Sequence, residues 1–569
     1  MADFRHPTAT TEAAGTFERG LAVLRAIATH PDPRLRRGDL TKATGLPRST
    51  VDRITATLLH LGHLRAEGQD LVLALRAMEL GNAYLASCGL VGPLAPLLTR
   101  LADELDESVT LAVPDVDGAR LIAQSTRRRA VYLAFHVGGV LPDDRTAAGV
   151  VPATTWDEER FETWRHRRTA DPLDAGFPAV PMLTTPAPDR EAVFRARVET
   201  ARARGWSLDD QWVEPGLLAV SAPVCNPPGQ DPTGRPVAAV NVLSHTSRHT
   251  AETFPDTVLP RLRVAVEDME AALGQAALTQ AALTQPGTGT VEPAAPTADD
   301  LKSAKAELGM GFLETLARGL AVLKAFRFAP HGGLTISTAA EASGLPRASA
   351  RRALHVLCDA GYAETDGKRF TLRPKVLDLG YARLAPLTLS DIAQPHLADL
   401  AAAVGESVSM AVLDGDQVRY VARVPAGRVM RVDISIGTRF PAYATSMGRV
   451  LLAGLPAADL ADLIRHSDRR PLTSRTLVDA ADLEAAVDAV ARDGWAMVDE
   501  ELHEGLRSLA VGVRDRSGTV VAAVNIALHV GRTTPAETGE RLLPALRATV
   551  ARIEADLAVA FDQAPLVVH

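Results

Sequence analysis

Apolar residues recur every three or four positions over Phe312–Phe328, which is the spacing of a helix that buries one face. A second, shorter helix is predicted to be capped by Ser337 and to end before Gly344. Gly344 permits a sharp turn, and Pro346 suits the first turn of a third helix over about 347–360. The pattern therefore predicts three helices, with a tight turn between the second and the third.

The third helix has an apolar face and a basic face. Ala350, Leu354 and Leu357 fall on one side at helical spacing, and we expect them to be buried. The side chains left toward solvent are polar or basic: Arg347, Ser349, Arg351 and Arg352. A short helix, a glycine-containing turn and a basic helix form the helix-turn-helix pattern, whose second helix enters the major groove of DNA.

A hairpin is predicted directly after this helix. Residues 362–364 and 368–372 flank Asp366-Gly367, and Asp-Gly between short alternating runs is a strong hairpin signal. A hairpin that follows a recognition helix is a wing. Lys368 and Arg369 lie at its tip, where we expect them to contact phosphate.

The same pattern occurs earlier in the chain. Arg19–Leu24 reappears as Arg318–Leu323, and the Gly-Leu-Pro-Arg turn at 45–48 reappears at 344–347, both at an offset of 299. Toward the end of each copy the offset slips to 289 and then to 284. A repeat of this length indicates a whole protein that has been duplicated and fused.

The first copy has its own candidate recognition helix at Arg48–His60. Its predicted DNA-contacting side chains are Arg48, Ser49, Thr50 and Arg53. The turn at Gly68 is followed by nearly uncharged residues, so we expect weaker contact with the DNA backbone there. Asp52 stands where the second copy has Arg351; a carboxylate favours cytosine and arginine favours guanine, which predicts an operator with unlike half-sites.

Beyond each basic segment the pattern changes to strands and helices. In the second copy, runs at 408–413 and 418–424 flank Asp414-Gly415-Asp416, and further strands are predicted at 509–513 and 520–527. The predicted helices cover 389–404, 446–455, 483–493 and 536–561. This order predicts an α+β body with an antiparallel sheet.

These elements divide the chain into six segments. In order, we predict a disordered tail (1–15), head 1 (16–80), body 1 (81–275), a flexible linker (276–311), head 2 (312–379) and body 2 (380–562). The linker is inferred from a duplicated Ala-Ala-Leu-Thr-Gln run and the Pro-, Gly- and Thr-rich stretch after it.

Charge is unevenly distributed over these segments. The whole chain has a net charge of −8, which alone argues against a nucleic acid partner. Residues 1–65 and 312–374 nevertheless carry +4 each, so the remainder carries −16. Positive charge concentrated in two equivalent modules favours double-stranded DNA as partner. The alternative is that the heads are small helical packing units that serve dimerisation only.

Several other classes of protein do not fit the sequence. No apolar run is long enough to cross a bilayer, no signal peptide is recognisable, and three scattered cysteines fit a reducing cytoplasm. Hydrolase, metalloprotease and dinucleotide motifs are absent, and the histidines lack metal-ligand spacing. Gly229–Arg235 has phosphate-loop glycine spacing but lacks the lysine, and we interpret it as a loop. We therefore predict no catalytic residues, no metal, no cofactor and no membrane contact.

Small polar residues at segment ends make body 2 a candidate binding module. Thr445–Arg449 opens a helix, where unpaired backbone N–H groups can hold an anion. Asp499–Glu501, Gly505–Ser508 and Asn525 lie on or beside predicted strands. The alternative interpretation is that Thr445 or Ser446 only caps its helix and that Arg507 only pairs with a carboxylate.

Both copies resemble the IclR family of bacterial transcription regulators over nearly their whole length. The resemblance is carried by Arg318–Leu323 and Gly344–Arg347 in head 2 and by Pro441–Arg449 and Glu504–Ala510 in body 2. It implies a winged helix-turn-helix domain followed by a GAF-like α/β effector-binding domain, occurring twice. Body 2 is similar to the subgroup that controls protocatechuate and β-ketoadipate metabolism, which implies an aromatic acid or its breakdown product as effector.

The resemblance also implies which residues line the effector pocket. In body 2 these are Ser446, Met447, Asp499, Leu506, Ser508 and Asn525. The body 1 equivalents are Ala147, Ala148, Asp210, Leu217, Ala219 and Asn241, so small polar side chains are lost and we expect a weakened or purely structural pocket there. The chain is expected to be an intramolecular pseudo-dimer, with a further homodimer left open. An enzyme that acts on an acidic metabolite is the remaining alternative.

Overall fold

The computed structural model describes residues 15–116, 118–127, 135–185, 189–227, 233–283, 309–329, 333–426, 434–531 and 533–562. The chain divides into two compact units, 1–386 and 387–569. The first unit holds head 1, body 1 and head 2, and the second holds body 2. Among the described helices no single one is long and apolar enough to cross a bilayer; one bent pair, Leu75–Ser87 with Val91–Leu105, passes on length and composition alone.

Head 1 consists of three helices and a hairpin. They are α1 (Thr16–Thr29), α2 (Arg37–Thr44), α3 (Arg48–His60), β1 (Leu64–Glu67) and β2 (Asp70–Leu73). Gly45 ends α2 with φ +67°, a left-handed conformation that glycine adopts without penalty, so the chain turns sharply into α3. The apolar faces meet in a core that includes Leu24, Leu40 and Ile54, all fully buried. The predicted turn at Gly68 is confirmed.

Head 2 repeats this arrangement. Its elements are α11 (Glu314–Ala325), α12 (Ile336–Ser343), α13 (Arg347–Asp359), β9 (Ala363–Thr365) and β10 (Phe370–Leu372). The predicted inward residues of α13, Ala350, Leu354 and Leu357, are fully buried. The predicted cap was wrong: Thr335, not Ser337, precedes α12 in extended conformation, and its Oγ1 accepts the Thr338 N–H.

Body 1 has one six-stranded antiparallel sheet in the order β5-β4-β3-β8-β7-β6. Its strands are β3 (Ser108–Pro114), β4 (Ala119–Ser125), β5 (Val140–Leu141), β6 (Ser207–Asp210), β7 (Leu217–Cys225) and β8 (Pro236–His245). Its helices are α5 (Val91–Leu105), α6 (Ala147–Ala153), α7 (Glu158–Ala170), α8 (Arg190–Arg204) and α9 (Thr253–Leu283). α5 packs against α9, whereas α6 contacts α8 and strands β7 and β8.

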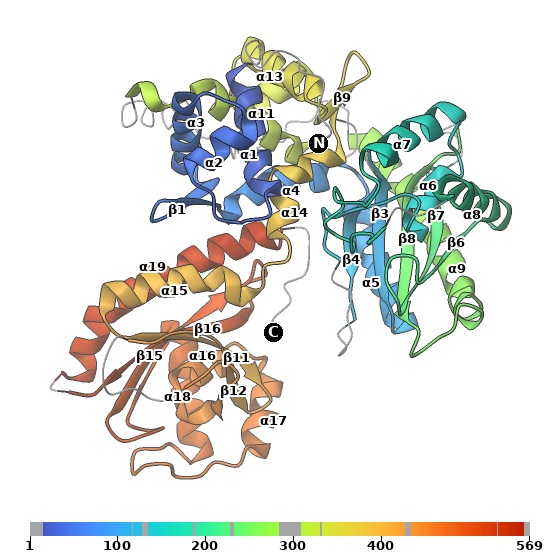
Figure 1. The fold of residues 1–569 in the computed structure, drawn as a ribbon. Coiled ribbons are helices and arrows are strands. Elements are labelled where there is room, and N and C mark those ends of the chain that lie inside the picture. The colour runs from blue at the N-terminus through green and yellow to red at the C-terminus, as the bar shows by residue number, and fades with distance from the viewer. Residues whose placement is uncertain are drawn as a thin grey trace. The chain divides into compact units, whose positions relative to one another are not determined.

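Body 2 has the equivalent sheet in the order β13-β12-β11-β16-β15-β14. The strands are β11 (Ser407–Asp414), β12 (Gln417–Val424), β13 (Arg439–Pro441), β14 (Trp495–Asp499), β15 (Leu506–Arg514) and β16 (Val520–His529). The helices are α15 (Leu389–Val404), α16 (Ser446–Ala453), α17 (Ala457–His466), α18 (Ala480–Asp493) and α19 (Pro535–Ala560). α15 and α19 lie side by side on one face of the sheet, and α16 and α18 lie on the other (Figure 1).

The remaining described elements lie in or beside the heads, apart from the last, which precedes α16 in body 2. They are the short helices η1 (Leu75–Ala77), α4 (Met78–Ser87), η2 (Gly309–Gly311), η3 (Phe326–Phe328), η4 (Pro374–Leu379), α14 (Tyr381–Leu384) and η5 (Ala442–Ala444). α9 continues to Leu283, so the first eight residues of the predicted linker are helical. The rest of that linker up to 308, residues 1–14 of the predicted tail and residues 229–232 of the predicted loop Gly229–Arg235 lie outside the described residues.

Candidate DNA-binding and effector sites

The basic faces of α3 and α13 are accessible. Arg48, Ser49 and Arg53 are exposed on α3 and Thr50 is half-buried; Arg347, Arg351 and Arg352 are exposed on α13 and Ser349 is half-buried. Each helix begins directly after a proline whose carbonyl receives the first helical N–H bonds, so its N-terminal turn is fixed against the preceding glycine turn. The geometry is that of a helix presented to a major groove.

The two recognition faces differ in charge. Asp52 lies 3.5 Å from Arg37, both at side-chain exposures above 40%, so the carboxylate stays accessible beside a cation. At the equivalent position α13 presents Arg351, which is exposed. The two helices therefore offer different hydrogen-bonding groups at matching positions, an acceptor in head 1 and a donor in head 2.

The wing of head 2 is ordered by its own turn. Asp366 Oδ1 accepts the backbone N–H groups of Lys368 at 2.8 Å and of Arg369 at 2.7 Å. These hydrogen bonds lower the pKa of the Asp366 carboxyl. Gly367 has φ +93°, and both basic side chains are exposed. In head 1, by contrast, the wing residue Asp70 pairs with Arg36, the N-cap of α2, at 3.2 Å, so the positive charge of Arg36 is partly neutralised.

The two heads contact each other reciprocally within the first unit. A Cβ on Gly20 of α1 would lie 2.3 Å from Leu316 of α11, and a Cβ on Gly319 of α11 would lie 2.4 Å from Phe17 of α1. Phe17 and Leu316 are equivalent positions, as are the two glycines. The contact is therefore the same surface used twice, as at the axis of a symmetric dimer.

Polar contacts reinforce this pairing. Lys324 Nζ lies 3.0 Å from Glu79 Oε2, and Thr57 Oγ1 accepts the Leu313 N–H at 3.0 Å. His63 beside this ion pair is fully buried, and burial together with Lys324 lowers its pKa to about 3. The imidazole is consequently neutral at physiological pH, and the head interface gains no extra positive charge from it.

Body 2 encloses a cavity of about 1010 Å³ between its sheet and the segment that leads into α16. Strands β11, β12, β15 and β16 supply nearly half of the residues that line it. Its rim includes the exposed residues His503, Glu504, His529 and Gly531. Tyr420 and Phe440 give it aromatic walls, with ring centroids 5.8 Å apart. The size is that of a site for a small organic ligand.

Three of the six predicted effector residues line this cavity: Leu506, Ser508 and Asn525. Ser446 is fully buried behind the cavity wall, where its Oγ donates to the Oγ of the wall residue Ser508 at 2.8 Å. Met447 is fully buried in the hydrophobic core instead of reaching the cavity wall. Asp499 pairs with Arg507 at 2.7 Å and also with Arg475.

The alternative interpretations of Thr445 as a helix cap and of Arg507 as the partner of a carboxylate are both correct. Thr445 Oγ1 accepts the Gly448 N–H at 3.0 Å and so caps α16, although Thr445 also lines the cavity. Arg507 is 3% exposed at its side chain and is engaged by Asp499, Thr533 and Thr538. It is therefore a structural residue that fixes the end of β14 to the start of α19.

The sequence reasoning missed several cavity residues. They are Glu406, Ser407, Ser409, Tyr420, Arg423, Phe440, His503 and His529. Ser407 and Ser409 alternate along β11, and Arg423 donates to the Ile434 carbonyl at 2.8 Å beside the cavity. The period-two alternation along the strands was the signal that could have found the serines.

The corresponding place in body 1 is almost filled. Only about 20 Å³ remains between Thr110, Thr146, Leu217, Ala219 and Asn241. Strand register shows that the place is the same: Asn241 pairs with Thr110 as Asn525 pairs with Ser409. Of the predicted equivalents, Asp210 is exposed, whereas Ala147 and Ala148 line the remnant.

Buried carboxylates also distinguish body 1. Burial raises the pKa of both Asp143 and Asp209 to about 7. Body 2 has Ala442 and Val498 at these positions. Among the described residues no group of three or more His, Cys, Asp or Glu side chains is placed to hold a metal ion.

Two family models match the chain, each twice. The IclR helix-turn-helix domain matches residues 16–68 and 315–367. The model described as the C-terminal domain of the bacterial transcriptional regulator IclR matches residues 82–271 and 382–555. Together these matches cover both heads and both bodies.

Similar proteins span about one copy of the repeat. The Pca regulon regulatory protein of Pseudomonas putida is 45% identical over 42% of this chain and 81% of its own length. The p-hydroxybenzoate hydroxylase transcriptional activator of Acinetobacter baylyi is 34% identical over 42% of this chain and 89% of its own length. The crystal structure of a transcriptional regulator from Rhodococcus sp. RHA1 is 47% identical, covers 44% of this chain and 100% of that chain, and has a TM-score of 0.41.

Proposed function

Because this chain belongs to the IclR family of bacterial transcriptional regulators, we propose that its two heads read one operator and that an aromatic acid bound in body 2 modulates this reading. Membership of the family makes the chain a DNA-binding regulator and not an enzyme. The exposed basic faces of α3 and α13 carry the proposal for DNA, and the cavity of about 1010 Å³ carries it for the effector. We place the protein in the cytoplasm, with its DNA.

The proposed base-reading groups are the solvent-facing side chains of the recognition helices. They are Arg48, Ser49, Thr50 and Arg53 of α3 and Arg347, Ser349, Arg351 and Arg352 of α13. Lys368 and Arg369 would contact phosphate from the wing. Since Asp52 occupies in head 1 the position that Arg351 occupies in head 2, the two half-sites should differ in sequence.

Footprinting and selection from random DNA with the purified full chain test this proposal. We expect a bipartite site with unlike halves. Asp52→Arg should make the first half-site resemble the second, because both helices would then present a guanidinium at that position. A perfect palindrome bound equally by both heads would contradict the proposal.

For the effector, the cavity offers complementary chemistry. Arg423, His503 and His529 supply cationic or donor groups for a carboxylate, and Tyr420 and Phe440 supply apolar walls for a ring. Asn525 lines the same cavity, is 3% exposed, and its Oδ1 has no hydrogen-bond partner among the described residues. The relatives' names connect this family branch to p-hydroxybenzoate metabolism, which favours a hydroxylated aromatic acid.

Thermal unfolding of the full chain with p-hydroxybenzoate and protocatechuate tests the effector class. A ligand at 100 times its Kd stabilises the folded state by about 2.7 kcal/mol, so body 2 should unfold at a higher temperature. Phenol, which lacks the carboxylate, is the matched control and should have little effect. Leu506→Trp, which places a bulky ring on the cavity wall, should reduce the shift; an equal shift in that variant would contradict the assignment to body 2.

Pairing of the heads supports the proposal of a pseudo-dimer within one chain. The reciprocal contact at Gly20 and Gly319 places two recognition helices in one unit, as two subunits would be in a dimeric regulator. Whether two such chains associate further is decided by sedimentation of the free protein.

A further inference from the structure

Body 1 has a longer connection after α7 than body 2 has after α17. α7 has 13 residues and α17 has 10, and the following connections are 171–189 and 467–479. The extra residues account for most of the slip in the repeat from an offset of 299 to 289. The lengthening is therefore local and lies between two helices that both bodies share.

The longer connection packs apolar side chains against residues that form the wall of the former cavity. Phe177 and Val180 are 3% and 5% exposed and belong to one cluster with Ala148, Val213 and Leu217. Val213 and Leu217 correspond to Leu502 and Leu506, which line the open cavity of body 2. The same wall thus faces open space in body 2 and the protein's own side chains in body 1.

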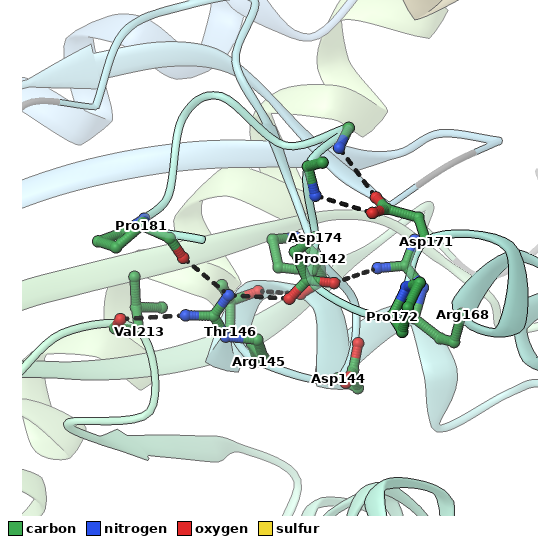
Figure 2. Close-up of polar contacts among 12 residues, drawn as sticks. Pro142, Asp144, Arg145, Thr146, Arg168, Asp171, Pro172, Asp174, Pro181 and Val213 are labelled. Carbon is green, nitrogen blue, oxygen red and sulfur yellow. Dashed lines mark hydrogen bonds and ion pairs between the residues drawn. The ribbon is translucent and has the colours of Figure 1, made fainter. Parts of the chain in front are cut away.

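An arginine anchors the connection from inside. Arg145 Nη1 donates to Asp174 Oδ2 at 2.8 Å and to the Pro181 carbonyl at 3.0 Å, and Nη2 donates to the Val213 carbonyl at 3.2 Å (Figure 2). Its equivalent is Ala444, which lines the cavity of body 2. In body 1 a guanidinium therefore occupies the space that corresponds to the open cavity beside Ala444 in body 2.

Asp174 is the centre of this arrangement. It is fully buried, and Arg168 and Arg190 also contact it, at 2.7 and 2.8 Å (Figure 2 shows Arg168). Its φ of +60° is unusual for a residue other than glycine, and the three guanidinium groups hold it there. Arg168 also lies over the Phe177 ring, 4.5 Å from its centroid.

The polar wall of body 1 is satisfied internally as well. Asn241 Oδ1 accepts from Ser221, and its Nδ2 donates to Thr110 Oγ1 at 3.1 Å. In body 2 Ser221 is replaced by Ala510, and Asn525 Oδ1 has no donor among the described residues. At this asparagine, therefore, body 1 satisfies internally a group that body 2 leaves without a partner.

We propose that residues 171–183, anchored by Arg145, are a built-in occupant of the effector cavity of body 1. The segment brings a carboxylate, Asp174, and a phenyl ring, Phe177, the two features of an aromatic acid. Body 1 is thereby held in one state, and the chain takes a single effector, in body 2. The identity of that effector depends on the proposed function, whereas the occupancy of body 1 does not.

Thiol accessibility tests the occupancy without any effector. In a chain whose Cys88, Cys225 and Cys358 are serine, Ala219→Cys and Ser508→Cys place thiols at equivalent positions of the two walls. Ser508→Cys should react with an aromatic disulfide reagent, and Ala219→Cys should react roughly 100-fold more slowly because its reaction requires local opening.

Removing the occupant should reverse this difference. Arg145→Ala with Phe177→Ala in the Ala219→Cys chain should raise the labelling rate toward that of Ser508→Cys. Arg202→Ala is the matched control, an exposed arginine of body 1 that pairs with Glu199, and should change nothing. Equal rates for the two original thiols, or no response to the double substitution in a chain that still folds by circular dichroism, would overturn the proposal.

Calorimetric titration with p-hydroxybenzoate then measures the stoichiometry. One site per chain, weakened in Leu506→Trp, is the expected result. Two sites, or one site whose affinity is unchanged in Leu506→Trp, would overturn the proposed occupancy of body 1. Absence of binding to the unmodified chain would contradict the proposed effector class and leave the thiol result to decide the occupancy.

Discussion

At the scale of single residues, two substitutions separate the copies more than any change of fold. Asp52 and Arg351 give equivalent helix positions opposite charge, and Arg145 and Ala444 give equivalent cavity positions a long cation and a methyl group. Equivalent glycines, by contrast, are kept where the heads meet, since neither Gly20 nor Gly319 has room for a Cβ.

The glycine contact yields a stability prediction. Gly319→Ala should destabilise the paired heads by about 1–3 kcal/mol, because the new methyl group overlaps the Phe17 ring. Denaturant unfolding of the full chain measures the loss, and Phe17→Leu in the same chain should recover part of it. Gly38→Ala is the control, because nothing lies within 4 Å of that position in α2; an equal loss there would refute the steric explanation.

The buried carboxylate Asp209 yields a pH prediction. Its folded-state pKa of about 7 lies above the ordinary value of 3.8, so folding favours the protonated form. The contribution is fully present below about pH 3.8 and is lost as the pH rises through 7, so body 1 should be less stable at pH 8 than at pH 5. Asp209→Asn should remove a part of this slope, on the order of 1 kcal/mol, in unfolding measured across that range.

The neighbouring carboxyl provides the control for that experiment. Asp210 is exposed and its charge is only a secondary cause of the raised Asp209 pKa, so Asp210→Asn should change the pH dependence of unfolding much less than Asp209→Asn does. The prediction is wrong if both variants flatten the slope equally.

At the scale of elements, the sequence correctly predicted helices whose bounds are set by local interactions. The bounds of α3 and α15 agree with the apolar periodicity and the flanking glycine turns. α17 was missed, and α12 was given the wrong cap because Thr335 and Ser337 are both suitable and only backbone conformation separates them. The cavity lining was predicted only in part: Leu506, Ser508 and Asn525 line it, whereas Met447 packs in the core, because side-chain direction depends on packing between elements.

The wing of head 2 yields a prediction about salt. Lys368→Ala with Arg369→Ala should weaken operator binding and reduce the slope of log K against log salt by about 2, one unit for each lost phosphate contact. Mobility-shift titrations at several salt concentrations measure both quantities. Gln69→Ala at the nearly uncharged wing of head 1 is the control, and an unchanged slope in the double variant would exclude the wing as a phosphate contact.

At the scale of the whole molecule, duplication has kept the heads alike and let the bodies diverge. Both heads retain the turn, the recognition helix and the hairpin, whereas the cavities measure about 1010 and 20 Å³. The family assignment followed from motifs in the sequence, but the difference between the cavities depended on how the connection 171–183 packs.

The covalent joining of the heads yields a prediction about stoichiometry. One chain should occupy one operator, with a binding curve that depends on the first power of protein concentration, because pairing of the heads does not require a second chain. Sedimentation of the protein–operator complex counts the chains. A binding curve that depends on the second power of protein concentration, with each chain protecting only one half-site, would contradict the pseudo-dimer.

The contact between Phe17 and Gly319 also has a genetic consequence. In a homodimer every substitution at the axis appears on both sides, and a defective allele spoils mixed dimers formed with normal subunits. Here the two sides are encoded separately within one gene, so Phe17 can face Gly319 while Leu316 faces Gly20. A mutation that damages the head contact should therefore be recessive. Chains made from an intact allele form this contact within themselves, so the mutant chains do not disrupt it.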